Sequence, residues 1–334
     1  MTHMGLGVRV RRGRPLVRGT SLLSESSLPM HKADALALYE LPLADLAARA
    51  DRARREHVGA TLELCTILNA RSGRCSEDCR FCAQSARYAT TAPEYPLVAR
   101  ETLLEAARRA REIGSDHFCI VSSGRALTGP EFDDVLTAVA VIREEVGIEV
   151  CGSLGCLTRE QLLRLRDAGV TRYQHNLETS RRFFPRIVTT HTFDDRVRTV
   201  RDARALGFSV CSGGIVGMGE TREDRIDMAL TLKELNVDVV PINALMPIPG
   251  TPLADREPVS PIEVLKTVAV FRLLLPDKTI KLAGGRESVL KEFQAMAFLS
   301  GANGMIVGGY LTQRGRPVEE DHRMIEEIRT AWTN

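Results

Sequence analysis

Eight short runs of apolar and β-branched residues alternate with longer amphipathic stretches from about residue 60 onward. Such alternation predicts strand–helix units that build a parallel sheet. Eight units over about 270 residues match the number and size of a (β/α)8 barrel of the TIM type, although an open, doubly wound sheet shows the same alternation. The predicted strands are residues 61–68, 117–123, 148–154, 171–177, 208–214, 237–245, 279–285 and 303–309.

The stretches between these strands have the residue spacing of surface helices. Residues 101–113 carry an apolar stripe at helical spacing, with Arg108 on the opposite face. Thr221 and Asp224 have the spacing of an N-terminal capping pair. Further helices are predicted at 159–169, 194–207 and 221–235, and glycines typical of helix C-termini follow at Gly114, Gly169 and Gly207.

The beginning of the chain does not share this pattern. Residues 1–30 contain five arginines before any acidic residue and a cluster of serines, which predicts a disordered tail. The same composition is also typical of an organellar transit peptide. Residues 31–58 read as one or two helices packed on the outside or the N-terminal end of the barrel, and residues 59–334 as the barrel domain.

Charge and hydropathy exclude several classes of function. Lys and Arg number 45 against 43 Asp and Glu, so no overall basic field indicates a nucleic acid as partner. No apolar run reaches the roughly 18 residues of a membrane span, so we expect a soluble protein without a membrane partner. Eight cysteines are too few for a secreted disulfide scaffold, and no signal peptide precedes them. We therefore expect a reducing compartment, the cytoplasm, or an organelle if residues 1–30 are a transit peptide.

Three cysteines, Cys75, Cys79 and Cys82, follow the first predicted strand within eight residues. In a barrel, the loop after a strand opens onto the catalytic face. A structural zinc site needs four ligands, and no further Cys or His occurs in the next thirty residues. A cubane iron–sulfur cluster usually takes four thiolates, so three would leave one iron open to another ligand.

The spacing Cys-x3-Cys-x2-Cys resembles the radical S-adenosylmethionine superfamily. In that superfamily, the open iron binds the amino and carboxylate groups of S-adenosylmethionine, and the reduced 4Fe–4S cluster cleaves this cofactor to a 5′-deoxyadenosyl radical. Further segments in the same order resemble the biotin synthase family over about residues 60–325. These segments are CSEDCRFCAQSARY, YQHNLETS, VCSGGIVGMGET, VPIN followed by PGTPL, and AGGRE.

The resemblance implies a binding site for both the 4Fe–4S cluster and S-adenosylmethionine. Cys75, Cys79 and Cys82 would hold the cluster. Phe81 stands where the family places an aromatic ring against the adenine, and Arg196 matches the arginine that pairs with the cofactor carboxylate. Four glycines would allow close backbone approach to the cofactor, or would only shape a turn: Gly213, Gly214, Gly217 and Gly219.

A second group of cysteines lies inside predicted strands. Cys119, Cys151 and Cys211 belong to the second, third and fifth strands, and alternate residues of barrel strands point inward, so the three would converge. Taken singly, each is more typical of a small buried hydrophobe. The resemblance alone implies that these cysteines and Arg286 ligate an auxiliary 2Fe–2S cluster whose sulfide enters the product. Cys65 and Cys156 lie outside the family pattern. They are either ordinary buried cysteines or ligands that support an auxiliary cluster with a different number of irons.

The resemblance also implies a substrate, dethiobiotin, and a pocket for it. Asn176 and Asn243 match asparagines that meet the ureido ring, whose N–H and C=O groups suit an amide side chain. Asn243 would otherwise cap a loop. Glu178 stands where we expect an aspartate and Gln174 where we expect an asparagine, and each is longer by one methylene.

The function implied is sulfur insertion at two C–H positions of dethiobiotin to form biotin, with no side chain acting as acid or base. Expected partners are a flavodoxin or ferredoxin that donates electrons, iron–sulfur assembly proteins, and a second copy of the chain in a homodimer. Two alternatives remain at this stage. One is a radical enzyme of the same superfamily with a different substrate, and the other is a non-catalytic iron–sulfur or zinc protein.

Overall fold

A closed parallel barrel contains all eight predicted strands in the computed structural model, which describes residues 31–312 and 315–333. The fifth predicted strand is divided, because its chain leaves the ladder at Ser212 and Gly213 and re-enters it as β6 (Gly214–Val216). The other strands are β1 (Glu63–Arg71), β2 (His117–Ser122), β3 (Glu149–Ser153), β4 (Arg172–Gln174), β5 (Ser209–Cys211), β7 (Val239–Ala244), β8 (Thr279–Leu282) and β9 (Gly304–Ile306).

The strand order shows how the sheet closes. Neighbouring strands follow the order β5-β4-β3-β2-β1-β9-β8-β7-β6, and β5 also pairs with β7 at Cys211 and Val239. All of these pairings are parallel. The pairing of β5 with β7 joins the two ends of the strand order, so the sheet is not open. Gly213 sits at the closure, where a Cβ atom would lie 2.0 Å from the carbonyl oxygen of Pro241. Only glycine fits this close approach of two backbones.

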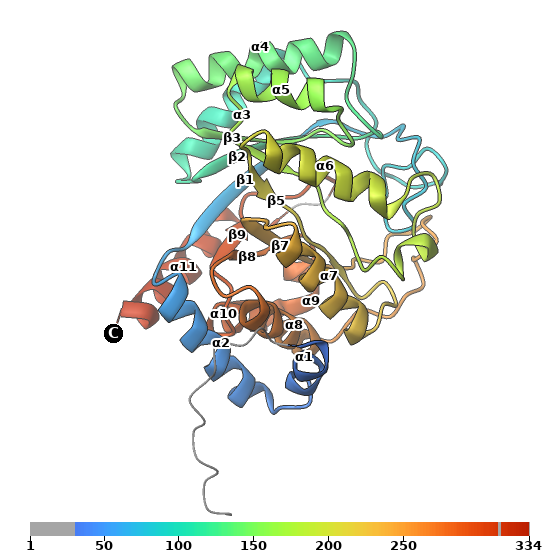
Figure 1. The fold of residues 1–334 in the computed structure, drawn as a ribbon. Helices are drawn as coiled ribbons and strands as arrows, with labels where there is room; N and C mark the ends of the chain where they lie inside the picture. Colours follow the sequence, from blue (N-terminus) through green and yellow to red (C-terminus); the bar gives the residue numbers. More distant parts are fainter. Residues whose placement is uncertain (1–30, 313–314, 334) are drawn as a thin grey trace, which may run out of the picture. The chain divides into compact units, whose positions relative to one another are not determined.

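Helices cover the outside of the barrel (Figure 1). Thr221 caps α7 by accepting a hydrogen bond from the backbone N–H of Asp224, whose side chain bonds back, as predicted. Gly169 ends α5 with a φ of 110°, in the left-handed region that glycine adopts without strain. The helices around the barrel are α3 (Arg100–Glu112), α4 (Pro130–Glu145), α5 (Arg159–Ala168), α6 (Phe193–Ala205), α7 (Arg222–Glu234), α8 (Pro261–Leu274), α9 (Arg286–Leu290), α10 (Gln294–Leu299) and α11 (Val318–Thr333).

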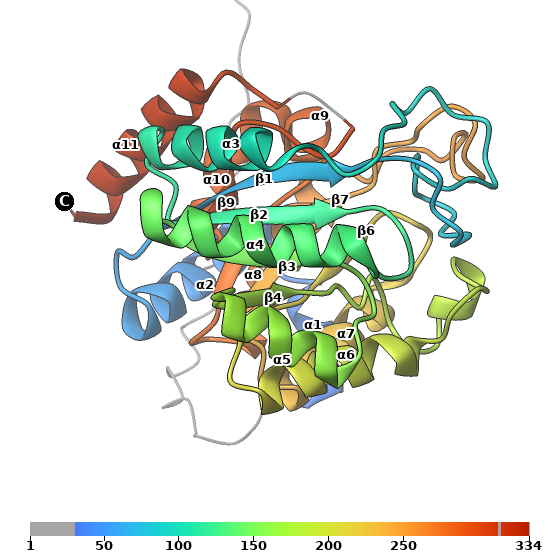
Figure 2. The same ribbon diagram turned by 90° about the horizontal axis from the view of Figure 1, so that it is seen from above.

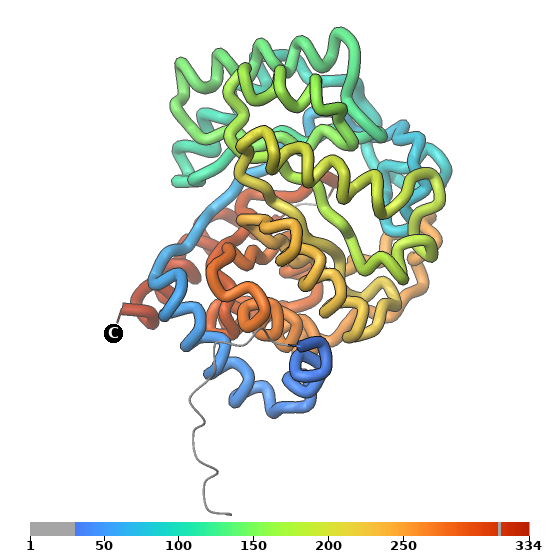
Figure 3. The backbone as a smooth tube through the Cα atoms, viewed as in Figure 1, coloured from blue at the N-terminus to red at the C-terminus, as the bar shows by residue number. Residues whose placement is uncertain are grey.

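Residues 31–58 contain two helices, α1 (Lys32–Leu38) and α2 (Leu43–His57). The guanidinium of Arg54 on α2 stacks on the ring of Trp332 at 3.9 Å, so the C-terminal helix α11 lies against α2 (Figure 3). The predicted tail or transit peptide, residues 1–30, lies outside the described residues. Among the described residues, no helix has the length and apolar character needed to cross a membrane.

The two ends of the barrel differ. The strand arrows of β1 and β2 point toward long loops, whereas α2 lies at the opposite end (Figure 2). The loop after β1, which carries the cysteine triplet, belongs to the end with long loops, where the carboxyl ends of the strands open. In a barrel of this kind, that end is where reactions take place.

Candidate functional site

All eight cysteines of the chain line one cavity of about 380 Å³. The cavity extends from the barrel interior to the loops at the carboxyl ends of the strands, because its lining includes residues of both. None of the eight forms a disulfide. Six predicted residues also line it: Phe81, Gln174, Asn176, Glu178, Arg196 and Asn243.

The cysteine loop, residues 75–82, is held in place by backbone hydrogen bonds. The backbone N–H of Cys75 donates to the carbonyl of Gln84 at 3.0 Å, and that of Cys82 donates to the carbonyl of Cys79 at 2.9 Å. Burial raises the pKa of the Cys79 thiol, and it raises the pKa of Cys82 to about 11. Ionisation of these thiols therefore requires a compensating positive charge, which a metal centre supplies.

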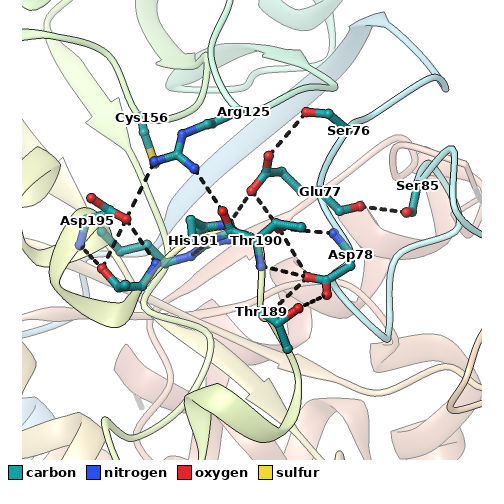
Figure 4. Close-up of polar contacts among 12 residues, drawn as sticks. Ser76, Glu77, Asp78, Ser85, Arg125, Cys156, Thr189, Thr190, His191 and Asp195 are labelled. Carbon is teal, nitrogen blue, oxygen red and sulfur yellow. Dashed lines mark hydrogen bonds and ion pairs between the residues drawn. The ribbon is translucent and has the colours of Figure 1, made fainter.

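Two carboxylates of the cysteine loop attach it to the segment before α6 (Figure 4). Asp78 accepts hydrogen bonds from the backbone N–H groups of Thr189 and Thr190, at 2.8 and 3.2 Å. Glu77 Oε2 lies 2.5 Å from His191 Nδ1. These contacts join residues more than 100 positions apart in the chain.

His191 continues this connection to Arg196. Arg196 Nε donates to His191 Nε2 at 3.0 Å, and its Nη1 donates to the carbonyl of Asn176 at 2.8 Å. Because Nε2 accepts this bond, the imidazole is neutral and carries its proton on Nδ1, where it donates to Glu77. Burial, together with the positive charge of Arg196, lowers the pKa of His191, in agreement with this form.

A polar wall follows β4. Gln174 Nε2 donates to Asn176 Oδ1 at 3.0 Å, and Asn176 Nδ2 donates to Glu178 Oε2 at 3.4 Å. Glu178 Oε1 lies 3.5 Å from Arg196 Nη1, while burial raises the pKa of Glu178. Glu178 has a φ of 70°, a left-handed conformation that is uncommon for a residue with a side chain.

Asn243 and the predicted glycines have structural contacts. Asn243 Nδ2 donates to the carbonyl of Gly214 at 3.1 Å, and its Oδ1 accepts from the N–H of Gly284 at 2.9 Å. Asn243 thus caps neighbouring strand ends, which is the alternative role considered from the sequence, while it also lines the cavity. The four predicted glycines are not among the cavity-lining residues; Gly217 and Gly219 turn the chain toward α7 with φ near 100°.

The isolated cysteines do converge, and Cys65 joins them. The sulfur atoms of Cys119 and Cys151 are 3.1 Å apart, and Cys65 packs against both. Burial raises the pKa of Cys65 to about 11 and that of Cys211 to about 12. Cys156 lies apart from this group, with its sulfur 3.5 Å from His175 Nε2.

A buried group of charges lies next to these interior thiols. Arg172 makes a two-pronged ion pair with Glu63 at 2.7 and 2.9 Å, and Lys281 Nζ lies 2.6 Å from Glu63. Burial opposes the charge of Lys281, but the neighbouring Cys65, Glu63 and Cys211 raise its pKa. Lys281 and Arg172 both line the cavity.

The structure does not bring Arg286 to the cysteines, contrary to the expectation from the sequence. Strand β8 ends at Leu282, and Gly284 and Gly285 then lead the chain into α9. Arg286 consequently pairs with Asp321 of α11 at 2.5 Å and does not line the cavity. Lys281 is the basic residue of this segment that faces the interior thiols. In the sequence, Lys281 stands out as a charged residue within the short strand TIKL, residues 279–282, and this signal could have identified it as a functional residue.

Comparisons with known proteins find two matching family models and several similar curated relatives. Residues 70–232 match the family model of the radical SAM superfamily, and residues 241–329 match the Biotin and Thiamin Synthesis associated domain. A biotin synthase of Pelotomaculum thermopropionicum is 47% identical over 311 residues, which cover 93% of this chain and 95% of that protein. A biotin synthase of Geobacter sulfurreducens is 48% identical over 309 residues, covering 92% and 94%.

Two solved structures share the fold. Methylornithine synthase aligns with a TM-score of 0.79 and 21% identity, covering 90% of this chain and 94% of that one. The FeFe-hydrogenase maturase HydG from Carboxydothermus hydrogenoformans aligns with a TM-score of 0.75 and 17% identity, covering 89% and 75%. At these identities the likeness is one of fold alone.

Proposed function

The chain belongs to the biotin synthase family of radical S-adenosylmethionine enzymes, and from this membership we propose how its own residues perform the family's reaction. The reaction is the insertion of sulfur into dethiobiotin at two C–H positions to form biotin. The chain is thus an enzyme, a sulfurtransferase. The observation that carries the assignment of roles is the presence of every cysteine in one cavity.

The cysteine loop fits a 4Fe–4S cluster. Cys75, Cys79 and Cys82 face the cavity together, and the raised pKa of two of their thiols calls for the positive charge of iron. When bound, this cluster and S-adenosylmethionine supply a radical that abstracts hydrogen from unactivated carbon, and the auxiliary iron–sulfur cluster supplies the sulfur. Phe81, next to the third thiol in the sequence, offers an apolar surface for the adenine.

Arg196 orients the carboxylate of S-adenosylmethionine in this proposal. Its Nε and Nη1 atoms are occupied by His191 and Asn176, which fix the plane of the guanidinium and leave Nη2 for an anion. The polar wall of Gln174, Asn176 and Glu178 provides amide and carboxylate groups for the polar parts of cofactor and substrate. Asn243 contributes by keeping the strand ends beside the substrate in place.

The interior thiols hold the auxiliary cluster. Cys65, Cys119, Cys151 and Cys211 give four sulfur ligands, so an arginine ligand is not needed. Lys281 takes the place that the sequence suggested for Arg286, as a buried cation beside anionic thiolates rather than as a ligand. Four thiolates suit a cluster of four irons as well as one of two.

Partners and compartment follow from the same reaction. We propose flavodoxin or ferredoxin as the electron donor, iron–sulfur assembly proteins that rebuild the auxiliary cluster, and a homodimer. We also propose the cytoplasm as the site of action, because eight free thiols require a reducing compartment.

The test is anaerobic reconstitution followed by an assay with dethiobiotin, S-adenosylmethionine and dithionite. We expect biotin and 5′-deoxyadenosine to appear together, with more than four irons per chain. Formation of 5′-deoxyadenosine without biotin would assign a different substrate. A count of four irons or fewer would contradict the two-cluster arrangement.

A further inference from the structure

A second depression lies on the outer side of the cysteine loop. It has a volume of about 430 Å³, and its lining includes three arginines, Arg80, Arg186 and Arg256, with one carboxylate, Asp255. Apolar residues such as Phe183 and Leu253 form the rest. We refer to this depression as the arginine cleft. The loops that form it lie at the end of the barrel where the strands open (Figures 1 and 2).

The side chains of all three arginines are exposed. Among the residues that the structure describes, no carboxylate lies within ion-pair distance of their guanidinium groups, whereas the adjacent Arg181 and Arg182 pair with Asp194 and Asp224. Arg80 Nη1 donates to the backbone carbonyl of Arg186, at 3.4 Å. Three positive charges against one negative charge make the cleft a site for an acidic partner.

The cleft is built directly on the cluster-binding loop. Arg80 follows Cys79 in the chain, so their Cα atoms are about 3.8 Å apart. The two carboxylates of the loop are already used, Glu77 by His191 and Asp78 by Thr189 and Thr190. The charge that the loop presents outward in the cleft is therefore positive.

We propose that the arginine cleft is the docking surface for the electron donor, a small acidic protein that carries a one-electron centre. This inference rests on the proposed function, because that function requires an electron to reach the cluster held by the cysteine loop. Cofactor and substrate occupy the inner side of the loop, so a protein carrier approaches from its outer side. One electron leaves the carrier and enters the cluster, and no bond forms or breaks.

The properties of the cleft suit such a complex. Electron-transfer partners form small and weak interfaces, for which a few arginines around an apolar floor are sufficient. Complementary charge speeds the encounter of two proteins and orients them. Guanidinium groups also pair with carboxylates in a fixed, planar geometry.

The experiment compares two reductants on the reconstituted enzyme. Reduced flavodoxin serves as the acidic carrier, and dithionite serves as the small reductant that needs no docking surface. The variants are Arg186→Glu and Arg256→Glu, and the matched control is Arg52→Glu, an exposed arginine on α2 at the other end of the barrel. The measured quantity is the rate of 5′-deoxyadenosine formation as a function of flavodoxin concentration.

We expect each charge reversal in the cleft to lower kcat/KM for flavodoxin by about 5- to 10-fold at low ionic strength, with a smaller loss at high salt. Rates with dithionite and rates of the Arg52 control should stay at the wild-type level. Unchanged flavodoxin kinetics would overturn the proposal, as would an equal loss with both reductants. A change in oligomeric state with unchanged flavodoxin kinetics would assign the cleft to a second copy of the chain instead. Wild-type biotin formation with dithionite tests the proposed function separately.

Discussion

Replacing Arg286 by methionine tests whether this residue is structural or a cluster ligand. The side chain is 2% exposed, and its Nη2 lies 2.5 Å from Asp321 and 3.0 Å from Glu287. Its Nη1 also donates to Gln294. Asp321 is fully buried, and its Oδ1 has no hydrogen-bond partner among the described residues. Without Arg286, the cation nearest to this buried carboxylate among the described residues is Arg316, at 3.9 Å.

Loss of one partner of a buried ion pair costs about 3–5 kcal/mol. At about 2.1 cal/mol/K of unfolding entropy per residue over roughly 300 residues, this cost lowers Tm by about 5–8 °C. The measurement is thermal unfolding of the metal-free, reduced chain, because a protein with tightly bound cofactors does not unfold as a two-state system. The double variant Arg286→Met/Asp321→Leu replaces both charges by apolar groups and should recover most of the loss.

Iron and sulfide analysis of the double variant decides the outcome. We expect the wild-type iron content, since neither residue lines the cavity. The double variant would refute this reasoning if it folded but lacked the Mössbauer signal of the auxiliary cluster. That result would show that Arg286 is a cluster ligand.

Three further predictions concern the site. Cys65→Ser should lower the iron content of the auxiliary site, measured by Mössbauer spectroscopy, whereas Cys156→Ser should not; equal spectra of the two variants would remove Cys65 from the ligands. His191→Leu should raise the KM for S-adenosylmethionine by about 10-fold, with a smaller effect on kcat, because Arg196 loses the acceptor of its Nε hydrogen bond. His191→Gln should recover part of the affinity. An effect on kcat alone would contradict this positioning role. Asp195 caps α6, and hydrogen bonds from Thr192 hold its pKa at about 2, below the ordinary 3.8. The stability due to its charge is present above about pH 4 and is lost as the pH falls toward 2, so amide exchange in α6 should rise with acid in the wild type but less in Asp195→Asn.

The strands were predictable from the sequence because each is a short, β-branched run, and the positions of the three interior cysteines followed from strand alternation. The position of Arg286 could not be predicted in this way, because the chain turns between the end of β8 at Leu282 and the start of α9. Gly284 and Gly285 turn the chain from β8 into α9, and Lys281 is the residue of this segment whose side chain points into the barrel. The contact between Glu77 and His191 joins residues 114 positions apart, and no local pattern indicates such a pairing.

Most barrels of this type fill their centre with layers of bulky side chains. In this chain the corresponding space is the cysteine-lined cavity, whose walls combine thiols, buried charges and apolar side chains such as Ile67 and Val121. Under the proposed function, an iron–sulfur cluster would occupy this space, so its insertion would add packing contacts that the polypeptide alone does not supply. Proteins that deliver iron and sulfide would then also stabilise the barrel, and consumption of the sulfur donor would remove part of that packing.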